Sequence, residues 1–372
     1  MPTTPKPILT LSRNVGLDLL RMTAIILVLW SHPPTSPSVL IGILSDRLGP
    51  TGVDLFFVLS GFLIGSLLFD EIAKTDSLDV KRFWIRRFMK IVPPYMLLVI
   101  AGTALNIARN RHAPLDGLYA MWPNIVHIQN YVRGDRPLGQ TWSLAVEEHF
   151  YLALPFMLVI MCRFRTVWSI FPLVAIGVMA ASFLSRVLLI SVSYAPQTHI
   201  FSTHIRIDNL MLGVLIAWLA KTEHPVLELL HRHWQVTLVV AGLLIGVPCL
   251  FERNHPFVFT VGYSLIAVGY ALIVIISYLS TIHVEAKTLN LLQKACIQIG
   301  QCSYSIYLWM AILAGRPLEM VASRMNFHSE VKYWLFLVVY ITSASVVGIV
   351  MNRLIELPIN SYRNRVFPRA TS

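Results

Sequence analysis

The 372-residue sequence contains few charged residues. Only 13% of its residues are Asp, Glu, Lys or Arg, against roughly 25% in an average soluble protein. In contrast, 56% are hydrophobic and the mean hydropathy is +0.65. So few polar side chains could not cover the surface of a water-soluble globule, which excludes a soluble enzyme, a disordered chain and a coiled coil. The composition predicts an all-α, polytopic integral membrane helix bundle.

Cysteine is also scarce, which excludes a secreted disulfide scaffold. The four cysteines are not part of any Cys-x-x-Cys or Cys/His cluster, and each lies in or beside an apolar run: Cys162, Cys249, Cys296 and Cys302. We interpret them as small buried hydrophobic residues. We therefore expect no metal or redox site.

The chain is short of negative charge, with a formal net charge of +11 and a pI near 9.7. In a soluble domain this excess would make nucleic acid a candidate partner. No DNA- or RNA-binding motif is present, and basic residues in the cytoplasmic loops of a membrane protein produce the same excess. We expect the lipid bilayer, and not a nucleic acid, to be the partner of this charge.

Apolar windows of about 20 residues predict ten transmembrane helices. The windows lie near residues 15–35, 51–70, 88–108, 142–162, 167–193, 205–220, 235–251, 258–280, 296–315 and 333–355. The sixth is short, so nine or eleven spans are alternatives. The loops on one side, together with both termini, hold 18 of the 30 Lys and Arg residues, which predicts cytoplasmic termini. We expect one membrane domain over residues 1–372, with short cytoplasmic tails at about 1–13 and 357–372.

The first span contains ionisable residues, which are functional candidates because charge inside a bilayer is costly. Asp18 and Arg21 are three residues apart and can pair on one helix face. Arg21 and His32 are eleven residues apart, so they share a face about 16 Å apart along the axis. The alternative is that each side chain reaches the headgroups at its own end of the span.

A basic cluster precedes Pro93 and Pro94. On a helix, Arg86, Arg87 and Lys90 would present neighbouring cations at the cytoplasmic surface, an arrangement that suits phosphate groups. The equally favoured alternative is a positive loop that contacts anionic lipid.

Other spans carry polar residues that we expect to support a site. Glu147 lies four residues from both Ser143 and Tyr151, which predicts a polar stripe, and only one of the adjacent Glu147 and Glu148 can face a site. Asp54, Arg206 and Asp208 lie at or near span ends. For Arg186, a functional role and a buried structural role with a carboxylate partner are equally favoured, and we interpret Ser60 as a packing residue.

Seven runs along nearly the whole chain, taken together and in this order, resemble the membrane acyltransferase 3 family. They are Gly16-Leu17-Asp18 to Arg21 to His32, residues 54–62, Phe83-Trp84-Ile85-Arg86-Arg87 to Pro94-Tyr95, Thr141-Trp142-Ser143-Leu144 to Glu147 to Phe150-Tyr151, Arg206-Ile207-Asp208, residues 303–309 and Ile355-Glu356-Leu357-Pro358.

The resemblance implies a ten-helix enzyme of the bacterial inner (plasma) membrane that moves an acyl group, usually acetyl, from cytoplasmic acyl-CoA to a hydroxyl of a sugar-containing, cell-envelope acceptor. Arg21 and His32 match the family's essential pair. Arg87 to Lys90 matches its Arg-x-x-Arg motif, except that Lys90 replaces the second arginine. Met310 stands where many members have His.

Acyl transfer needs a base, a group that stabilises the oxyanion and an anchor for the donor. We expect His32 to be the base, oriented by Glu147 or Asp18, and an acyl-histidine relay is a second route. Arg21 would steer the thioester, while Arg86, Arg87 and Lys90 would hold the phosphates of acetyl-CoA. The alternatives are a transporter or flippase for a glycolipid or small anionic substrate, and the other large type of membrane-bound O-acyltransferase.

Overall fold

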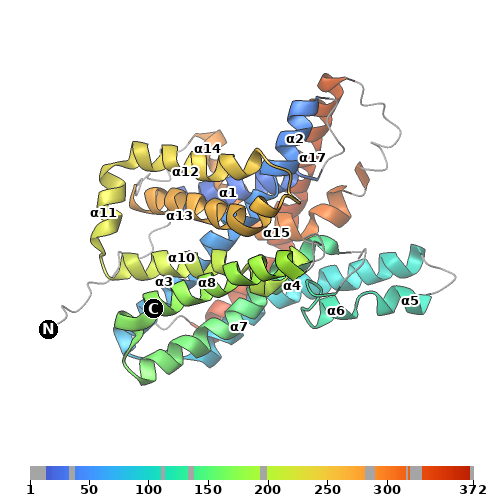
Figure 1. Ribbon diagram of the computed structural model, residues 1–372. Helices are drawn as coiled ribbons and strands as arrows, with labels where there is room; N and C mark the ends of the chain where they lie inside the picture. The colour runs from blue at the N-terminus through green and yellow to red at the C-terminus, as the bar shows by residue number, and fades with distance from the viewer. Residues whose placement is uncertain are drawn as a thin grey trace.

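The computed structural model describes residues 14–32, 38–109, 114–132, 138–192, 199–280, 290–315, 317–318 and 329–368. Over these ranges the chain is helical and contains no strand (Figure 1). The α-helices are α1 (Val15–Trp30), α2 (Val39–Leu48), α3 (Thr51–Thr75), α4 (Val80–Arg109), α5 (Pro114–Tyr119), α6 (Trp122–Ile125), α7 (Trp142–Arg163), α8 (Val167–Val192), α10 (Ile207–Lys221), α11 (Pro225–Arg232), α12 (Trp234–Cys249), α13 (Tyr263–Leu279), α14 (Leu291–Gln301), α15 (Ser303–Trp309), α17 (Glu330–Met351) and α18 (Leu357–Val366).

Each of the ten predicted windows overlaps a helix. Among the described residues, six helical segments are long and apolar enough to cross a membrane, and the number is eight if two bent pairs each count as one span. The bent pairs are α10 with α11, at 98°, and α14 with α15 and the turn that follows it, at 62°. Since α12 is apolar but shorter, the count of ten spans and the cytoplasmic location of the termini stay predictions.

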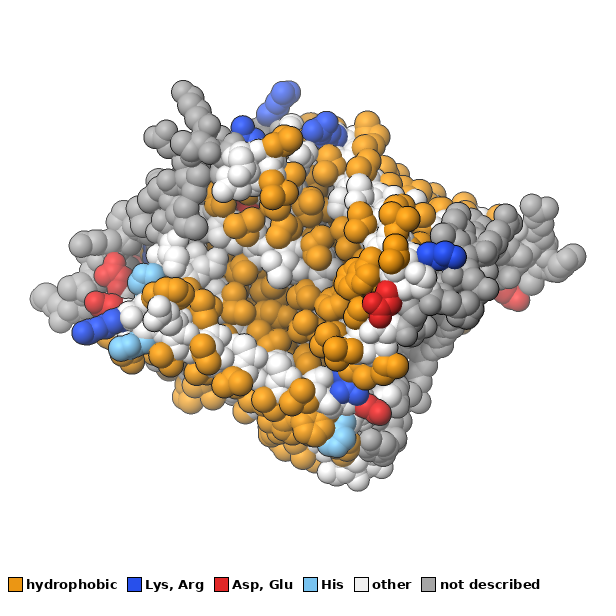
Figure 2. All heavy atoms as spheres, turned by 90° about the horizontal axis from the view of Figure 1, so that it is seen from above, with side chains coloured by type: hydrophobic (Ala, Val, Ile, Leu, Met, Phe, Trp, Pro, Cys, Tyr) orange, Lys and Arg blue, Asp and Glu red, His pale blue; other side chains and the backbone are white. Residues whose placement is uncertain are grey.

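Helix α3 lies at the centre of the bundle, where it packs against α1, α7, α10 and α13 (Figure 1). Its hydrophobic window is 67% buried, whereas that of α8 is only 17% buried. Figure 2 shows a broad apolar surface over one face of the molecule. An apolar exterior around a well-packed centre is the arrangement expected when lipid covers the outside.

Two glycines allow α3 and α10 to pack in close contact. A Cβ atom at Gly61 would lie 1.9 Å from the Leu210 carbonyl oxygen, and one at Gly213 would lie 2.2 Å from the Val58 carbonyl oxygen. No side chain fits at such distances, so the two backbones approach directly, as small residues permit in membrane helices. This contact fixes α3 with its polar residues Asp54 and Ser60.

Wide π-helical turns interrupt three helices. They are η3 (Val258–Gly262) before α13, η4 (Met310–Gly315) after α15, and η5 (Asn352–Glu356) between α17 and α18. Two other short elements, η1 (Gly139–Thr141) and η2 (Thr203–Ile205), are 3₁₀ turns. Such π turns are rare and often occur at functional sites. Here each of the three contributes residues to a cavity described below.

Two predicted boundaries differ from the structure. The predicted window at 88–108 is part of α4, which begins at Val80, so the basic cluster lies on a helix and not in a loop. Of the predicted C-terminal tail, Leu357–Val366 forms α18, which continues from α17 through η5. The predicted N-terminal tail, residues 1–13, lies outside the described residues.

Candidate active site

Three cavities follow one another through the bundle and share lining residues. We name them the Arg86 pocket, of about 590 Å³, the Glu147 pocket, of about 280 Å³, and the His32 pocket, of about 600 Å³. The first two share Arg87, Lys90, Gln301 and Glu356. The second and third share Val53 and Tyr307. The cavities are therefore adjacent, and we call their series from the basic cluster on α4 to His32 the path.

The Arg86 pocket contains an excess of cations. Its carboxylates Asp70 and Glu71 pair with Lys221 and Arg82, each at 2.9 Å. In the part of the chain that the structure describes, the other charged side chains that line it are five cations and a single carboxylate: Arg86, Arg87, Lys90, Arg353, Arg363 and Glu356. The basic cluster thus faces a cavity, and a cavity of this charge suits a ligand with several phosphates.

The C-terminal part of the chain forms one wall of the Arg86 pocket. Arg353 and Asn352 come from η5, and Arg363 comes from α18. Arg86 donates hydrogen bonds to the Phe367 carbonyl oxygen and to the side chain of Asn364, which joins α4 to this wall. Sequence reasoning missed Arg363 because it assigned residues 357–372 to a tail, and it missed Arg353 because it placed residues 333–355 in a membrane span.

The Glu147 pocket contains the predicted polar stripe. Ser143, Glu147 and Tyr151 all line it, and Glu148 is not among its lining residues. Glu147 accepts hydrogen bonds from Ser60 at 2.9 Å and from the Tyr151 hydroxyl at 3.1 Å. Ser60, interpreted from the sequence as a packing residue, therefore holds the carboxylate from the neighbouring helix.

Two basic residues, Arg21 and Arg87, also line the Glu147 pocket. Arg21 lines the Glu147 pocket and pairs with Asp18 at 2.7 Å, which confirms the predicted contact within α1. Asp18 also accepts a hydrogen bond from Gln301 at 3.0 Å. The Arg87 guanidinium lies 5.3 Å from the ring centroid of Tyr151, within the range of a cation–π interaction.

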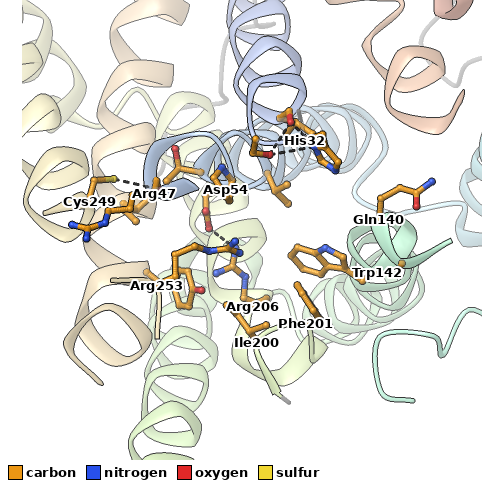
Figure 3. A pocket seen from close by; sticks show the side chains of 18 of the residues that line it. His32, Arg47, Asp54, Gln140, Trp142, Ile200, Phe201, Arg206, Cys249 and Arg253 are labelled. Atoms are coloured by element: carbon orange, nitrogen blue, oxygen red, sulfur yellow. Dashed lines mark hydrogen bonds and ion pairs between the residues drawn. The ribbon is translucent and has the colours of Figure 1, made fainter. Parts of the chain in front are cut away.

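His32 lies just after α1 and is exposed in the His32 pocket (Figure 3). Its Nδ1 lies 2.7 Å from the Val28 carbonyl oxygen. A carbonyl can only accept a hydrogen bond, so this contact favours the tautomer with the proton on Nδ1 and the basic lone pair on Nε2.

Among its described contacts, His32 meets neither Glu147 nor Asp18, so the expectation that either carboxylate orients it stays a prediction. Glu147 lines a different pocket, and Asp18 contacts Arg21 and Gln301. Nδ1 lies near a backbone carbonyl in the helical turn that precedes His32 and also near the Ser31 hydroxyl, at 3.3 Å. Arg21 and His32 line successive cavities, as their predicted shared face on α1 implies.

The remaining predicted polar residues form a buried network beside the His32 pocket. Asp54 accepts from Arg206 and from Asn209, each at 2.6 Å. Arg206 also lies 4.1 Å from the ring centroid of Tyr263. Asp208 pairs with Arg186 at 2.8 Å, and Arg186 is fully buried, so of the two interpretations of Arg186 the structural one holds.

The four cysteines are free thiols in the structure. Within the part of the chain that the structure describes, no group of three or more His, Cys, Asp or Glu side chains is arranged to hold a metal ion.

The model of a family described as an acyltransferase domain, acyltransferase 3, matches residues 14–353. A Staphylococcus aureus (strain COL) protein named "Putative O-acetyltransferase" is 30% identical over 320 residues, covering 79% of this chain and 49% of the relative. Peptidoglycan O-acetyltransferase OatA of Listeria monocytogenes is 29% identical over 290 residues, covering 70% of this chain and 44% of the relative.

A Bacillus subtilis (strain 168) protein named "Putative peptidoglycan O-acetyltransferase YrhL" is 26% identical over 338 residues, covering 85% of this chain and 51% of the relative. The chain spans about half the length of the curated relatives it matches. No solved structure matches it. Since the family match covers most of the sequence and the helices are long and apolar, the chain belongs to the acyltransferase 3 family and is a multi-pass bacterial membrane protein.

Proposed function

We propose that this protein is an O-acetyltransferase that takes an acetyl group from cytoplasmic acetyl-CoA and transfers it to a hydroxyl of a sugar-containing, cell-envelope acceptor. The observation that carries the proposal is the path of three adjacent cavities, with a cation-rich pocket at one end and His32 at the other. A donor that carries phosphates and an acceptor that carries a hydroxyl need different sites. This path supplies a site for each, with the Glu147 pocket between them.

The donor would bind in the Arg86 pocket, which faces the cytoplasm in the predicted topology. CoA carries a diphosphate and a 3′-phosphate, and Arg86, Arg87 and Lys90 on α4 lie in one cavity with Arg353 and Arg363. Arginine binds phosphate through two parallel hydrogen bonds, whereas Lys90 acts as a point charge. The pantetheine arm would extend past Arg87 and Lys90 into the Glu147 pocket, since both residues line both cavities.

The acceptor would bind in the His32 pocket. Nε2 of His32 removes the proton from the acceptor hydroxyl, and the oxygen attacks the thioester carbonyl carbon. The carbon–sulfur bond breaks as the ester carbon–oxygen bond forms, and the CoA sulfur leaves and takes up the proton. Arg21 lines the Glu147 pocket on the route of the thioester, and a cation there can stabilise the oxyanion.

The test measures free CoA thiol released from acetyl-CoA by the purified protein in detergent, with a panel of sugar acceptors. We expect acceptor-stimulated release by the wild type and at least a hundredfold slower release by His32→Ala, because general-base catalysis contributes about 10²- to 10⁴-fold. CoA binding should be retained. The matched control is His231→Ala, because His231 is exposed on α11 and lines none of the three pockets.

A second variant tests the donor site. Arg87→Ala should raise the KM for acetyl-CoA roughly 10-fold or more, because a hydrogen bond between charged groups is lost. Full activity of His32→Ala, or loss of CoA binding in it, would remove the assignment of His32 as the base. Movement of a glycolipid across vesicles without any CoA release would instead favour the transporter.

A further inference from the structure

The described lining of the His32 pocket has an excess of positive charge, which the binding of a neutral acceptor does not require. Among the described residues, its lining includes Arg47, Arg206 and Arg253 but a single carboxylate, Asp54. Asp54 lies 2.6 Å from Arg206 and also accepts from Asn209, so it compensates the charge of Arg206. No other carboxylate in the described lining compensates the charges of Arg47 and Arg253.

Arg253 is suited to bind a ligand, because it lines the pocket and its side chain is partly exposed. It lies in the turn after α12, and its side chain is 39% exposed. The acidic partner described for it is Asp46 at 3.8 Å, whose side chain is 67% exposed, and a pair of that length between exposed groups contributes little. A stronger anion in the pocket could therefore take the place of Asp46.

Arg47 has a second role. It donates a hydrogen bond to the Leu250 carbonyl oxygen, and its own carbonyl oxygen lies 3.6 Å from the Cys249 sulfur. These contacts tie α2 to the end of α12. Arg47 thus combines a structural contact with its charge, which makes Arg253 the clearer residue for an experiment.

The other side of the pocket is aromatic. The rings of Trp142 and Phe201 lie with centroids 4.7 Å apart, and Tyr263, Tyr307 and Tyr340 also line the cavity. Figure 3 shows Arg47 and Arg253 on one side of the pocket and Trp142 and Phe201 on the other, with His32 at the upper end. Aromatic faces with a few placed polar groups are typical of pockets that bind a ring and fix its orientation.

We propose that the His32 pocket selects a sugar acceptor that carries an anionic group, a carboxylate or a phosphate. The sugar ring lies against Trp142 and Phe201, the anion contacts Arg253 and Arg47, and this places a hydroxyl of the same sugar at His32. Charge-assisted hydrogen bonds from arginine favour such an acceptor. The inference rests on the proposed function, since it names the acceptor class of the same site.

The experiment compares three acceptors with one ring: N-acetylglucosamine, its 6-phosphate, and N-acetylmuramic acid, which adds a carboxylate. For the wild type we expect kcat/KM to be at least 10-fold higher for one or both anionic sugars than for the neutral sugar. Arg253→Gln should lower kcat/KM for the preferred anionic sugar roughly 10- to 100-fold, the range for loss of a hydrogen bond to a charged group. Its effect on the neutral sugar and on the KM for acetyl-CoA should be less than twofold.

Two further variants separate recognition from folding. Arg253→Lys should restore part of the preference for the anionic sugar, because it restores the charge. Asp46→Asn is the matched control: it breaks the Arg253 pair from the other side, so a purely structural role of that pair predicts the same loss as Arg253→Gln, whereas anion recognition predicts no loss. The two anionic arms distinguish a phosphate from a carboxylate.

The results also separate this inference from the proposed function. His32-dependent CoA release with equal kcat/KM for neutral and anionic sugars would overturn the inference alone. Absence of release with any sugar would count against the proposed function. In that case, binding of the three sugars in the absence of CoA still decides the inference, since equal affinity of the wild type and Arg253→Gln for the anionic sugars would overturn it.

Discussion

At the scale of single residues, the buried ion pairs determine where charge lies in this molecule. Arg206 and Asp54 are only 4% and 3% exposed in their side chains, and Arg186 and Asp208 only 0% and 6%. A buried charge needs its partner because the desolvation cost of an ion is several kcal/mol. Of the supporting polar residues predicted from the sequence, Asp54, Arg206 and Asp208 therefore stabilise the structure around the His32 pocket.

One prediction at this scale concerns Asp54. Asp54→Asn should lower the free energy of unfolding by about 3 to 5 kcal/mol, because it leaves the Arg206 guanidinium buried without a carboxylate. The measurement is the thermal unfolding midpoint in detergent. Asp46→Asn, at an exposed pair, should leave the midpoint unchanged. The double variant Asp54→Asn/Arg206→Met should recover much of the loss, and an unchanged midpoint for Asp54→Asn alone would contradict the explanation.

At the scale of elements, the close contact of α3 with α10 positions most of the path. Helix α3 contributes Val53 and Asp54 to the His32 pocket, and Val53 and Ser60 to the Glu147 pocket. Helix α10 contributes Asn209, which donates a hydrogen bond to Asp54. The two helices can approach closely because Gly61 and Gly213 face each other. Their packing thus couples the stability of the bundle to the geometry of the site.

A matched pair of glycine variants tests this contact. Gly213→Ala should destabilise the protein by about 1 to 3 kcal/mol, because its methyl group would lie 2.2 Å from the Val58 carbonyl oxygen. Gly242→Ala on α12 is the control, because nothing lies within 4 Å of a Cβ atom there. It should be neutral or slightly stabilising, since alanine favours helix. Equal melting midpoints for the two variants would argue against close packing at Gly213.

At the scale of the whole molecule, the path depends on the junctions between cavities. Val53 and Tyr307 line both the Glu147 pocket and the His32 pocket. The Tyr307 hydroxyl lies 2.6 Å from the Ser143 hydroxyl and donates to the Gln140 carbonyl oxygen, so α15 meets the start of α7 there. Any acyl group that passes from the cation-rich end to His32 must pass this junction.

Obstruction of the junction should separate donor binding from transfer. Val53→Phe should lower acceptor-dependent CoA release at least 10-fold, because a larger side chain fills the passage, while binding of labelled CoA stays within twofold of the wild type. Val53→Ala enlarges the passage and serves as the control, with release retained. If Val53→Phe released CoA at the wild-type rate, acyl groups would not pass between these two pockets.

Much of the site could be predicted from the sequence where contacts are local. The i,i+3 pair of Asp18 with Arg21 and the i,i+4 stripe of Ser143, Glu147 and Tyr151 follow from helix geometry alone, and both are present. The apolar composition likewise determined the helical, membrane-spanning character, because backbone groups in lipid must be paired within each segment.

Only the tertiary structure decided which distant residues meet. Ser60 contacts Glu147 across 87 positions, and Asp54 contacts Arg206 across 152. The structure places Glu147 in the middle cavity and not in the His32 pocket. It also brings the arginines of η5 and α18 to the basic cluster of α4. Such contacts depend on how helices distant in the sequence pack against each other, and periodicity within a single helix carries no information about its neighbours.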